Sequence, residues 1–272
     1  MIEIFYKIKK KGIFFYLNNY FTLYFFRVKK KFIKTINYQS IKIKIVLNSS
    51  NGTVDNSIMR RGYFGENIIP EIQKELNRNK NFIDVGANIG LFSLILSNYC
   101  NKVYSFEPIQ RLHNQFKESI ELNNFNNIEL FNYGCGNEEI TSEITINPMN
   151  AGGSTVLSHN NDITGVKKEL IKLNTLDNLI TDINVDVIKI NVEGFEYFVL
   201  LGAKKIISKF KPIIFMEYSP NLYEKINQGM SRELYDFIKS YNYSIYNLTS
   251  NKLFNSFEEL PTHQCDLKLI YK

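Results

Sequence analysis

The chain has 272 residues, enough for one large domain or for a domain with an appendage. Its three scattered cysteines, Cys100, Cys135 and Cys265, have no metal-site spacing and fit a reducing compartment, so we expect a cytoplasmic protein. The formal net charge is +6, but residues 1–34 hold nine basic residues and one acid, which leaves 24 basic and 26 acidic residues elsewhere. The main part of the chain therefore gives no argument for nucleic-acid binding.

The N-terminal segment is basic and aromatic. Its apolar stretch, residues 13–26, is too short and too polar for a membrane span, and no small-residue cleavage site follows it. Polar and apolar residues separate at helical spacing, which predicts a basic amphipathic helix. Its apolar face could pack on the main domain or on a second subunit, and the second case would give an oligomer. It could also contact an anionic membrane surface through residues 7–34, or a nucleic acid.

An alternation of apolar and polar residues from Ile36 to Leu47 predicts a half-exposed strand. We expect residues 1–55 to form an appendage and residues 56–272 to form the main domain. A helix is predicted over 67–76, with Pro70 near its start.

The main domain is organised around a strand, a glycine turn and a helix. Phe82–Val85 is typical of a buried strand, Gly86-Ala87-Asn88-Ile89-Gly90 of a tight turn, and Leu91–Leu96 of an apolar helix start. Such a unit brings bare backbone amides up to a ligand. A second strand, 103–106, ends in Glu107 and Pro108, where an acid can accept both hydroxyls of an adenosine ribose.

The residue in the middle of the turn indicates which nucleoside ligand fits. A dinucleotide needs a glycine where this chain has Asn88, because the pyrophosphate must approach the backbone closely. S-adenosylmethionine has no phosphate, and its zwitterionic methionine end suits Asp84 together with the turn amides. We therefore expect S-adenosylmethionine as the cofactor, and a nicotinamide-dependent oxidoreductase is disfavoured. The alternative is a plain turn whose glycines serve packing only.

The rest of the chain alternates strands and helices. A helix over 109–122 and a third strand over 128–133 follow, and residues 133–136, Tyr133 and Gly134 among them, are expected to line the adenine. Residues 138–184 form an insertion, with a strand at 143–147, a strand or short helix at 166–173 and a capped helix at 175–179. Its glycine loop at 152–155 suits a substrate lid, although a simple surface hairpin is the alternative.

Five further elements complete the pattern. We predict strands at 185–192, 212–216, 243–248 and 266–271, and a helix at 232–240. This order indicates an α/β fold whose mostly parallel sheet is covered on both faces.

Four motifs carry a resemblance to a known family. They are Ile83-Asp-Val-Gly-Ala-Asn-Ile-Gly90, Ser105-Phe-Glu-Pro108, Thr175-Leu-Asp177, and Ile188-Lys-Ile-Asn-Val-Glu-Gly-Phe-Glu196 with Val199-Leu-Leu-Gly202. Over residues 57–220 the chain resembles the FkbM family of S-adenosylmethionine-dependent methyltransferases. The resemblance implies the class I methyltransferase fold, a Rossmann-like sheet of seven strands with an antiparallel last strand. It also implies methyl transfer to a hydroxyl, often on sugars, polyketides or other secondary metabolites.

One position departs from the family pattern, which has Asp where this chain has Asn191. Asparagine can hold a substrate hydroxyl or the cofactor but cannot take a proton. Glu193 is the first candidate for base or substrate orienter, Glu217 the second, and His159 in the insertion a third. No set of carboxylates has a metal-site pattern, so we expect no metal. A catalytically inactive cofactor-binding protein or scaffold is the alternative to an active enzyme.

Overall fold

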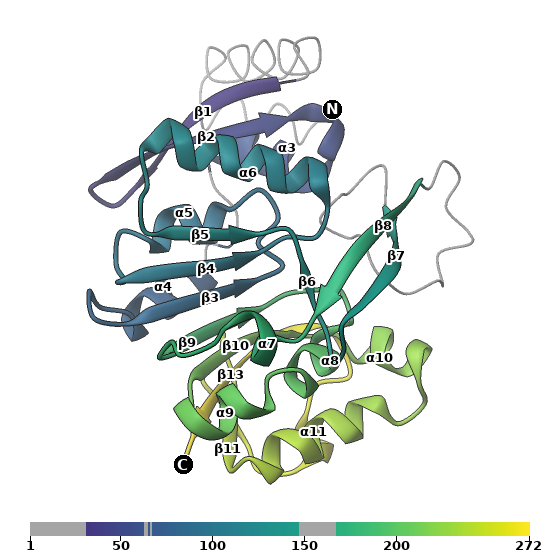
Figure 1. Ribbon diagram of the computed structural model, residues 1–272. Helices are drawn as coiled ribbons and strands as arrows, with labels where there is room; N and C mark the ends of the chain where they lie inside the picture. The colour runs from purple at the N-terminus through teal and green to yellow at the C-terminus, as the bar shows by residue number, and fades with distance from the viewer. Residues whose placement is uncertain (1–30, 63–64, 66, 147–166) are drawn as a thin grey trace, which may run out of the picture.

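The computed structural model describes residues 31–62, 65, 67–146 and 167–272 (Figure 1). The predicted N-terminal helix, the glycine loop at 152–155 and His159 lie outside the described residues, so their predicted roles stay predictions.

A large sheet forms the centre of the molecule (Figure 1), with strand order β12-β11-β13-β10-β9-β3-β4-β5. The strands from β10 to β5 run parallel, whereas β13 is antiparallel to both β10 and β11. This confirms the predicted class I fold with its reversed strand, and the two-residue β12 adds an eighth strand at one edge. The bounds are β3 Asn81–Val85, β4 Lys102–Phe106, β5 Ile128–Phe131, β9 Val187–Ile190, β10 Ile213–Tyr218, β11 Tyr243–Asn247, β12 Leu253–Phe254 and β13 Cys265–Tyr271.

Helices cover both faces of this sheet because neighbouring strand residues point to opposite sides. Phe82 and Val187 belong to one buried core cluster, whereas Ile83 and Ile188 belong to the other. The first cluster is completed by α3 Thr53–Arg61, α4 Ile68–Glu75, α5 Leu91–Leu96 and α6 Gln110–Asn123. The second is completed by α7 Leu176–Leu179, α8 Glu196–Leu201, α9 Lys204–Phe210, α10 Pro220–Ile226 and α11 Met230–Ser240.

The N-terminal part differs from the single strand expected over 36–47. It is an antiparallel hairpin of β1 Lys31–Tyr38 and β2 Ile41–Asn48. Its turn contains no glycine, and Gln39 takes the positive φ of 50° instead. The hairpin packs on α6, where Gln115 donates to the Val46 carbonyl at 2.8 Å. The proposed boundary between residues 55 and 56 falls inside α3, so the division into an appendage and a main domain remains a proposal.

The insertion adds a second, smaller sheet beyond the carboxyl ends of the central strands (Figure 1). It consists of β6 Gly134–Cys135, β7 Ile140–Ile146 and β8 Lys167–Asn174 in the order β6-β8-β7. The prediction left strand and helix both open for residues 166–173, and the described residues from Lys167 onward form a strand. The predicted cap at Thr175 is present, since its side chain accepts a hydrogen bond from the Asn178 amide.

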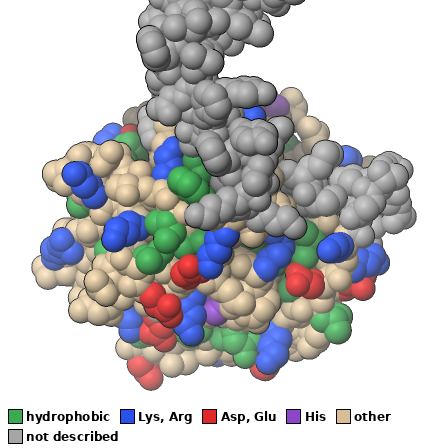
Figure 2. Space-filling model, turned by 90° about the horizontal axis from the view of Figure 1, so that it is seen from above, with side chains coloured by type: hydrophobic (Ala, Val, Ile, Leu, Met, Phe, Trp, Pro, Cys, Tyr) green, Lys and Arg blue, Asp and Glu red, His purple; other side chains and the backbone are tan. Residues whose placement is uncertain are grey.

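The surface carries mixed charge. On the face shown in Figure 2, the lysine and arginine side chains of the described residues are spread over the surface, with acidic side chains among them. No helix within the described ranges is long and apolar enough to cross a membrane.

Candidate functional site

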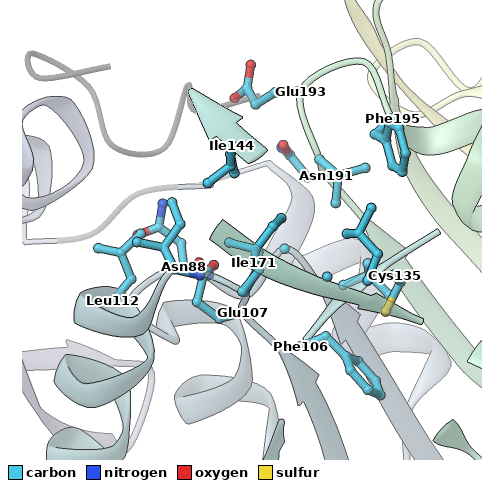
Figure 3. Close-up of a pocket in the computed structure, with 17 residues that line it drawn as sticks. Asn88, Phe106, Glu107, Leu112, Cys135, Ile144, Ile171, Asn191, Glu193 and Phe195 are labelled. Atoms are coloured by element: carbon cyan, nitrogen blue, oxygen red, sulfur yellow. Dashed lines mark hydrogen bonds between the residues drawn. The ribbon is translucent and has the colours of Figure 1, made fainter. Parts of the chain in front are cut away.

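Two neighbouring cavities open at the carboxyl ends of β3, β4, β9 and β10. The first cavity encloses about 600 Å³ of space that continues into solvent, and Figure 3 shows the side chains around it. The second cavity encloses about 830 Å³ in the same sense. Four residues line both cavities: Gly86, Asn88, Asn191 and Glu193. A group bound in one cavity can therefore reach a group bound in the other at this shared wall.

Glu107 lies at the base of the first cavity, beside Asn88 (Figure 3). It follows β4 and is buried, with only 4% of its surface exposed. Its Oε1 accepts from the Ile109 amide and its Oε2 from the Asn88 amide, each at 2.9 Å. A carboxylate has about four acceptor positions, so each oxygen of Glu107 can still accept one ligand hydroxyl.

The turn from Gly86 to Gly90 does not present bare amides, which corrects the expectation from the sequence. The amides of Gly86 and Ala87 both donate to the Phe106 carbonyl, and that of Gly90 donates to Ala87. The Asn88 amide donates to Glu107, and the Ile89 amide donates to the Asn88 side chain. The turn is thus closed by its own hydrogen bonds, and side chains and shape must recognise the ligand.

Gly86 and Gly90 serve close packing instead. A Cβ on Gly86, whose φ is 74°, would lie 1.9 Å from the Asn191 carbonyl oxygen. A Cβ on Gly90, at φ 85°, would lie 2.0 Å from the Phe116 ring. Gly90 lines neither cavity, whereas Gly86 is where β3 and β9 come together at the shared wall.

Asp84, which was expected to meet the methionine end of the cofactor, lies beneath the turn in the structure. Its side chain is fully buried and lines neither cavity. Its Oδ2 accepts from Ser93 at 2.6 Å, and its Oδ1 forms an ion pair with the Lys189 ammonium at 3.0 Å. Asp84 therefore holds the strand, the helix and Lys189 together from behind the site.

Three candidate residues gather at the carboxyl ends of β9 and β10. Asn191 and Glu193 line both cavities, and Glu217 lines the second. Asn191 donates a long hydrogen bond of 3.4 Å to the Glu217 carboxylate. In Figure 3, Glu193 lies at the rim of the first cavity with its carboxylate directed away from Glu107. Glu193 also has a positive φ of 55°, which is uncommon outside glycine and concentrates at functional sites.

The electrostatics of this region favour protonated acids. Burial raises the pKa of Glu193 to about 8, and the charges of Glu217 and Glu196 add to the effect while Lys189 opposes it. Burial likewise raises the pKa of Glu107 to about 7, against its two backbone hydrogen bonds and Lys189. Such shifted acids in a cleft are typical of functional sites.

Glu196 supports the loop that carries Glu193. Its Oε1 accepts from the Val192 amide at 3.0 Å and, more weakly, from the Gly194 amide at 3.4 Å. Its Oε2 accepts from the Tyr223 hydroxyl at 3.0 Å. Because α8 begins at Glu196, the glutamate in its first turn is Glu196 rather than Glu193.

The small sheet forms an apolar roof over the first cavity. Ile144 from β7 and Ile171 and Leu173 from β8 line it, and Leu112 and Phe195 add to its walls (Figure 3). The sequence analysis missed these side chains, although the buried positions of an alternating strand pair next to the site could have indicated them.

Of the other residues expected to contact the cofactor, three line a cavity and one does not. Pro108 and Gly134 line the first cavity, and Ala87 lines the second. Tyr133, which was expected beside the base, lines neither cavity and packs against the second core cluster. Cys135, its second neighbour along the chain, lines the first cavity.

The first cavity suits S-adenosylmethionine. It joins a buried carboxylate with free acceptor positions, for a ribose, to an apolar roof, for a purine, and none of the described residues that line it is basic, as a phosphate would require. Within the described part of the chain, no group of three or more His, Cys, Asp or Glu is placed to hold a metal ion.

Comparisons with known proteins also indicate a methyltransferase. The family model for the methyltransferase FkbM domain matches residues 84–245, more than half of the chain. Methyltransferase 1 of Beauveria bassiana (strain ARSEF 2860) is 25% identical over 141 residues, which cover 44% of this chain and 57% of that protein. The chain thus matches little more than half of that relative's length.

Two solved structures illustrate the similarity of fold. Methyltransferase FkbM from Methylobacillus flagellatus KT is 17% identical, with 74% of this chain and 50% of that chain covered at a TM-score of 0.46. A Streptococcus mutans protein in complex with SAH is 13% identical, with 74% and 94% covered at a TM-score of 0.46. RNA methylases are among other similar structures. At TM-scores below 0.5 these structures carry no argument about the acceptor.

Proposed function

The chain belongs to the FkbM-domain methyltransferases, whose methyl donor is S-adenosylmethionine, and we propose that it methylates a hydroxyl of a small metabolite or glycan. When bound, the donor supplies an already activated methyl group on its sulfonium. The residues of the chain must then hold the acceptor oxygen in line with this methyl group and exclude water.

One observation carries the proposal: Glu193 stands at the wall shared by the two cavities, with a pKa raised to about 8. We assign the first cavity to the donor and the second to the acceptor. A general base works best when its pKa lies near the working pH. In its ionised form Glu193 would take the proton of the acceptor hydroxyl as the methyl group is transferred.

Asn191 and Glu217 complete the acceptor side of the proposed mechanism. Asn191 can donate to or accept from a hydroxyl but cannot remove its proton. Glu217 lies within 3.4 Å of the Asn191 amide nitrogen and lines the second cavity, so it would orient the acceptor or replace Glu193 as base. The donor would be held by Gly86, Ala87, Asn88, Glu107, Pro108 and Gly134.

The charges around the second cavity favour a neutral acceptor over a nucleic acid. Glu193 and Glu217 line this cavity, and Asp266 lies next to Glu217 on the paired strand. Lys189 is the one basic side chain among the described residues that line this cavity, whereas nucleic-acid sites collect several lysine and arginine side chains. We further propose a cytoplasmic protein that could meet a membrane or a second subunit through residues 7–34.

A second candidate function is cofactor binding without catalysis. The residue that favours it is Asn191, which stands where the family pattern has an acid. In that case the donor cavity would bind its ligand normally, and no acceptor would be methylated.

The test is methyl transfer from labelled S-adenosylmethionine to a panel of sugars, glycans and hydroxylated metabolites. With an accepted substrate, Glu193→Gln should lower kcat by about 10²–10⁴-fold, the usual contribution of a general base, and leave S-adenosylhomocysteine affinity within a few-fold. Glu143→Gln, on the exposed part of β7, serves as the control and should keep full activity. Full activity of Glu193→Gln would contradict the base assignment, and a panel without any accepted substrate would favour the second candidate.

A further inference from the structure

Lys189 lies in the middle of β9, whose four residues are all buried. Only 7% of its side chain is exposed. An ammonium ion in such a place costs several kcal/mol unless a counter-charge and hydrogen bonds compensate it. The contacts around Lys189 therefore indicate its structural role.

The Lys189 ammonium has its partners at the end of β3. It donates hydrogen bonds to the Gly86 carbonyl at 2.9 Å and the Val85 carbonyl at 3.3 Å, and it forms an ion pair with Asp84 Oδ1 at 3.0 Å. The Phe92 ring lies 5.1 Å away as an additional cation–π partner. A counter-charge and two hydrogen bonds thus compensate the burial of the ammonium.

These contacts fix the turn that forms the wall between the cavities. Val85 ends β3, and Gly86 is the first residue of the turn and lines both cavities. The Val85 carbonyl also accepts from the Asn191 amide at 3.2 Å. Lys189 thus ties the donor side of the site, on β3, to the loop after β9 that carries Asn191 and Glu193.

Lys189 is also the only basic residue among the described residues that line the two cavities. Acids from the neighbouring elements face it: Asp84 of β3, Glu107 after β4, Glu193 after β9, Glu217 of β10 and Asp266 of β13. Its charge lowers the pKa of Glu107, Glu193 and Asp266, against the larger effect of burial.

We propose that Lys189 is a positioning residue for methyl transfer, which shapes the donor-binding turn and places one positive charge among the acids around the two cavities. The proposal rests on the proposed function. It differs from a purely stabilising ion pair, because an ion pair of that kind can be removed as a pair without any effect on the ligand.

The experiment compares the wild type with Lys189→Met, the double variant Asp84→Asn/Lys189→Met and Lys189→Arg. The double variant removes both buried charges, so that neither is left unpaired if the single variant fails to fold. Lys102→Met is the matched control, since Lys102 lies on neighbouring β4 in an exposed pair with Glu129. Each protein is checked by circular dichroism and titrated calorimetrically with S-adenosylhomocysteine from pH 6 to pH 9.

We expect the folded double variant to bind S-adenosylhomocysteine at least about 10-fold more weakly than the wild type. The pH midpoint of its rate profile should rise by about one unit, because Glu193 and Asp266 lose their nearby cation, whereas for Glu107 the loss of Asp84 opposes the loss of Lys189. Lys189→Arg, which keeps the charge, should restore most of the midpoint shift, and Lys102→Met should match the wild type.

Two outcomes distinguish a failure of the Lys189 proposal from a failure of the proposed function. A folded double variant with wild-type affinity and an unchanged pH midpoint would overturn the role of Lys189 alone. A folded wild type that binds no S-adenosylhomocysteine would overturn the proposed function and this inference with it.

Discussion

At the scale of single residues, the loop after β9 concentrates backbone strain and charge. Glu193 has a φ of 55° and Gly194 a φ of 97°, and the Glu196 carboxylate holds the amides on either side of Glu193. A non-glycine residue in this conformation costs on the order of 1 kcal/mol and persists only where its surroundings impose it. The loop therefore presents the Glu193 carboxylate in one fixed direction at the shared wall.

The role of Asn191 gives a prediction at this scale. If Glu193 is the base, Asn191→Asp should leave kcat within about threefold and move the pH–rate profile to higher pH, because a new charge beside Glu217 disfavours a second carboxylate. The measurement is the pH–rate profile of both proteins with the same acceptor. A rise in kcat of about 100-fold or more would instead assign the base to position 191.

Single residues could be predicted from the sequence only in part. Glu107 and Asn88 follow from the strand–turn–strand pattern, and both line the first cavity. The position of Asp84 before the turn can be predicted from the sequence, but the direction of its side chain cannot. In the structure this side chain points beneath the turn to Lys189, its cross-strand neighbour on β9. The sequence analysis gave Lys189 no role, because its contacts depend on β3 lying next to β9 in the sheet. The sequence of β9 alone does not contain this strand order.

At the scale of elements, the turn between β3 and α5 depends on Gly86. Gly86→Ala should destabilise the protein by about 3 kcal/mol or more, because the new Cβ meets the Asn191 carbonyl oxygen in addition to the strained φ. Gly229→Ala is the control, since Gly229 has a similar φ of 88° but no atom near its Cβ position, and should cost only about 1–2 kcal/mol. Urea unfolding of both variants measures the difference, and equal losses would show that the close approach of β3 and β9 is unimportant.

The apolar roof gives a second prediction for elements. Ile171→Asn should weaken S-adenosylhomocysteine binding by about 10-fold or more, because a polar amide would face the purine without a partner. Leu170→Asn, at the adjacent position, should bind as the wild type does, since 75% of Leu170 is exposed. Calorimetry compares the two variants, and an unaffected Ile171→Asn would exclude the small sheet from the ligand site.

Elements with regular patterns were predicted well, and irregular ones were not. The predicted bounds of β3 and α6 are nearly correct, whereas the strand predicted at 185–192 extends two residues too far at each end of β9. The β1–β2 hairpin was read as one strand because its turn, around Gln39, has neither glycine nor asparagine to mark it. The pairing of β6 with β8 joins segments more than 30 residues apart, and local sequence does not record it.

At the scale of the whole molecule, the fold followed from the alternation of strands and helices, since parallel neighbours and crossover helices leave few arrangements. The reversed β13 and the two helix layers agree with this prediction. The position of the hairpin on α6 did not follow, because it depends on long-range contacts such as that between Gln115 and Val46.

The buried acids predict how stability depends on pH. Burial raises the pKa of Asp55 and Asp266 to about 6, of Glu107 and Glu196 to about 7 and of Glu193 to about 8. A carboxyl group whose pKa is raised by folding stabilises the protein below its unfolded pKa, and this stability is lost as the pH rises through the folded pKa. His113, whose pKa burial lowers, acts in the opposite direction but is a single group.

The Tm should therefore fall by about 5 °C or more between pH 5.5 and pH 8, as expected if roughly 2 kcal/mol is lost in a chain of this size. Thermal unfolding in buffers of constant ionic strength measures it. Glu196→Gln keeps the hydrogen-bonding shape of Glu196 and should flatten the curve. A Tm that is constant or rises over this range would contradict the burial of these acids.

The measurement that tests the account most directly is a calorimetric titration of the wild type and Glu107→Ala with S-adenosylhomocysteine, with NAD as the control ligand. We expect micromolar binding to the wild type and about 100-fold or weaker binding to Glu107→Ala, because the ribose loses its acceptor, and no binding of NAD. A folded wild type that fails to bind S-adenosylhomocysteine, or that binds NAD instead, would contradict the assignment of the first cavity to the methyl donor.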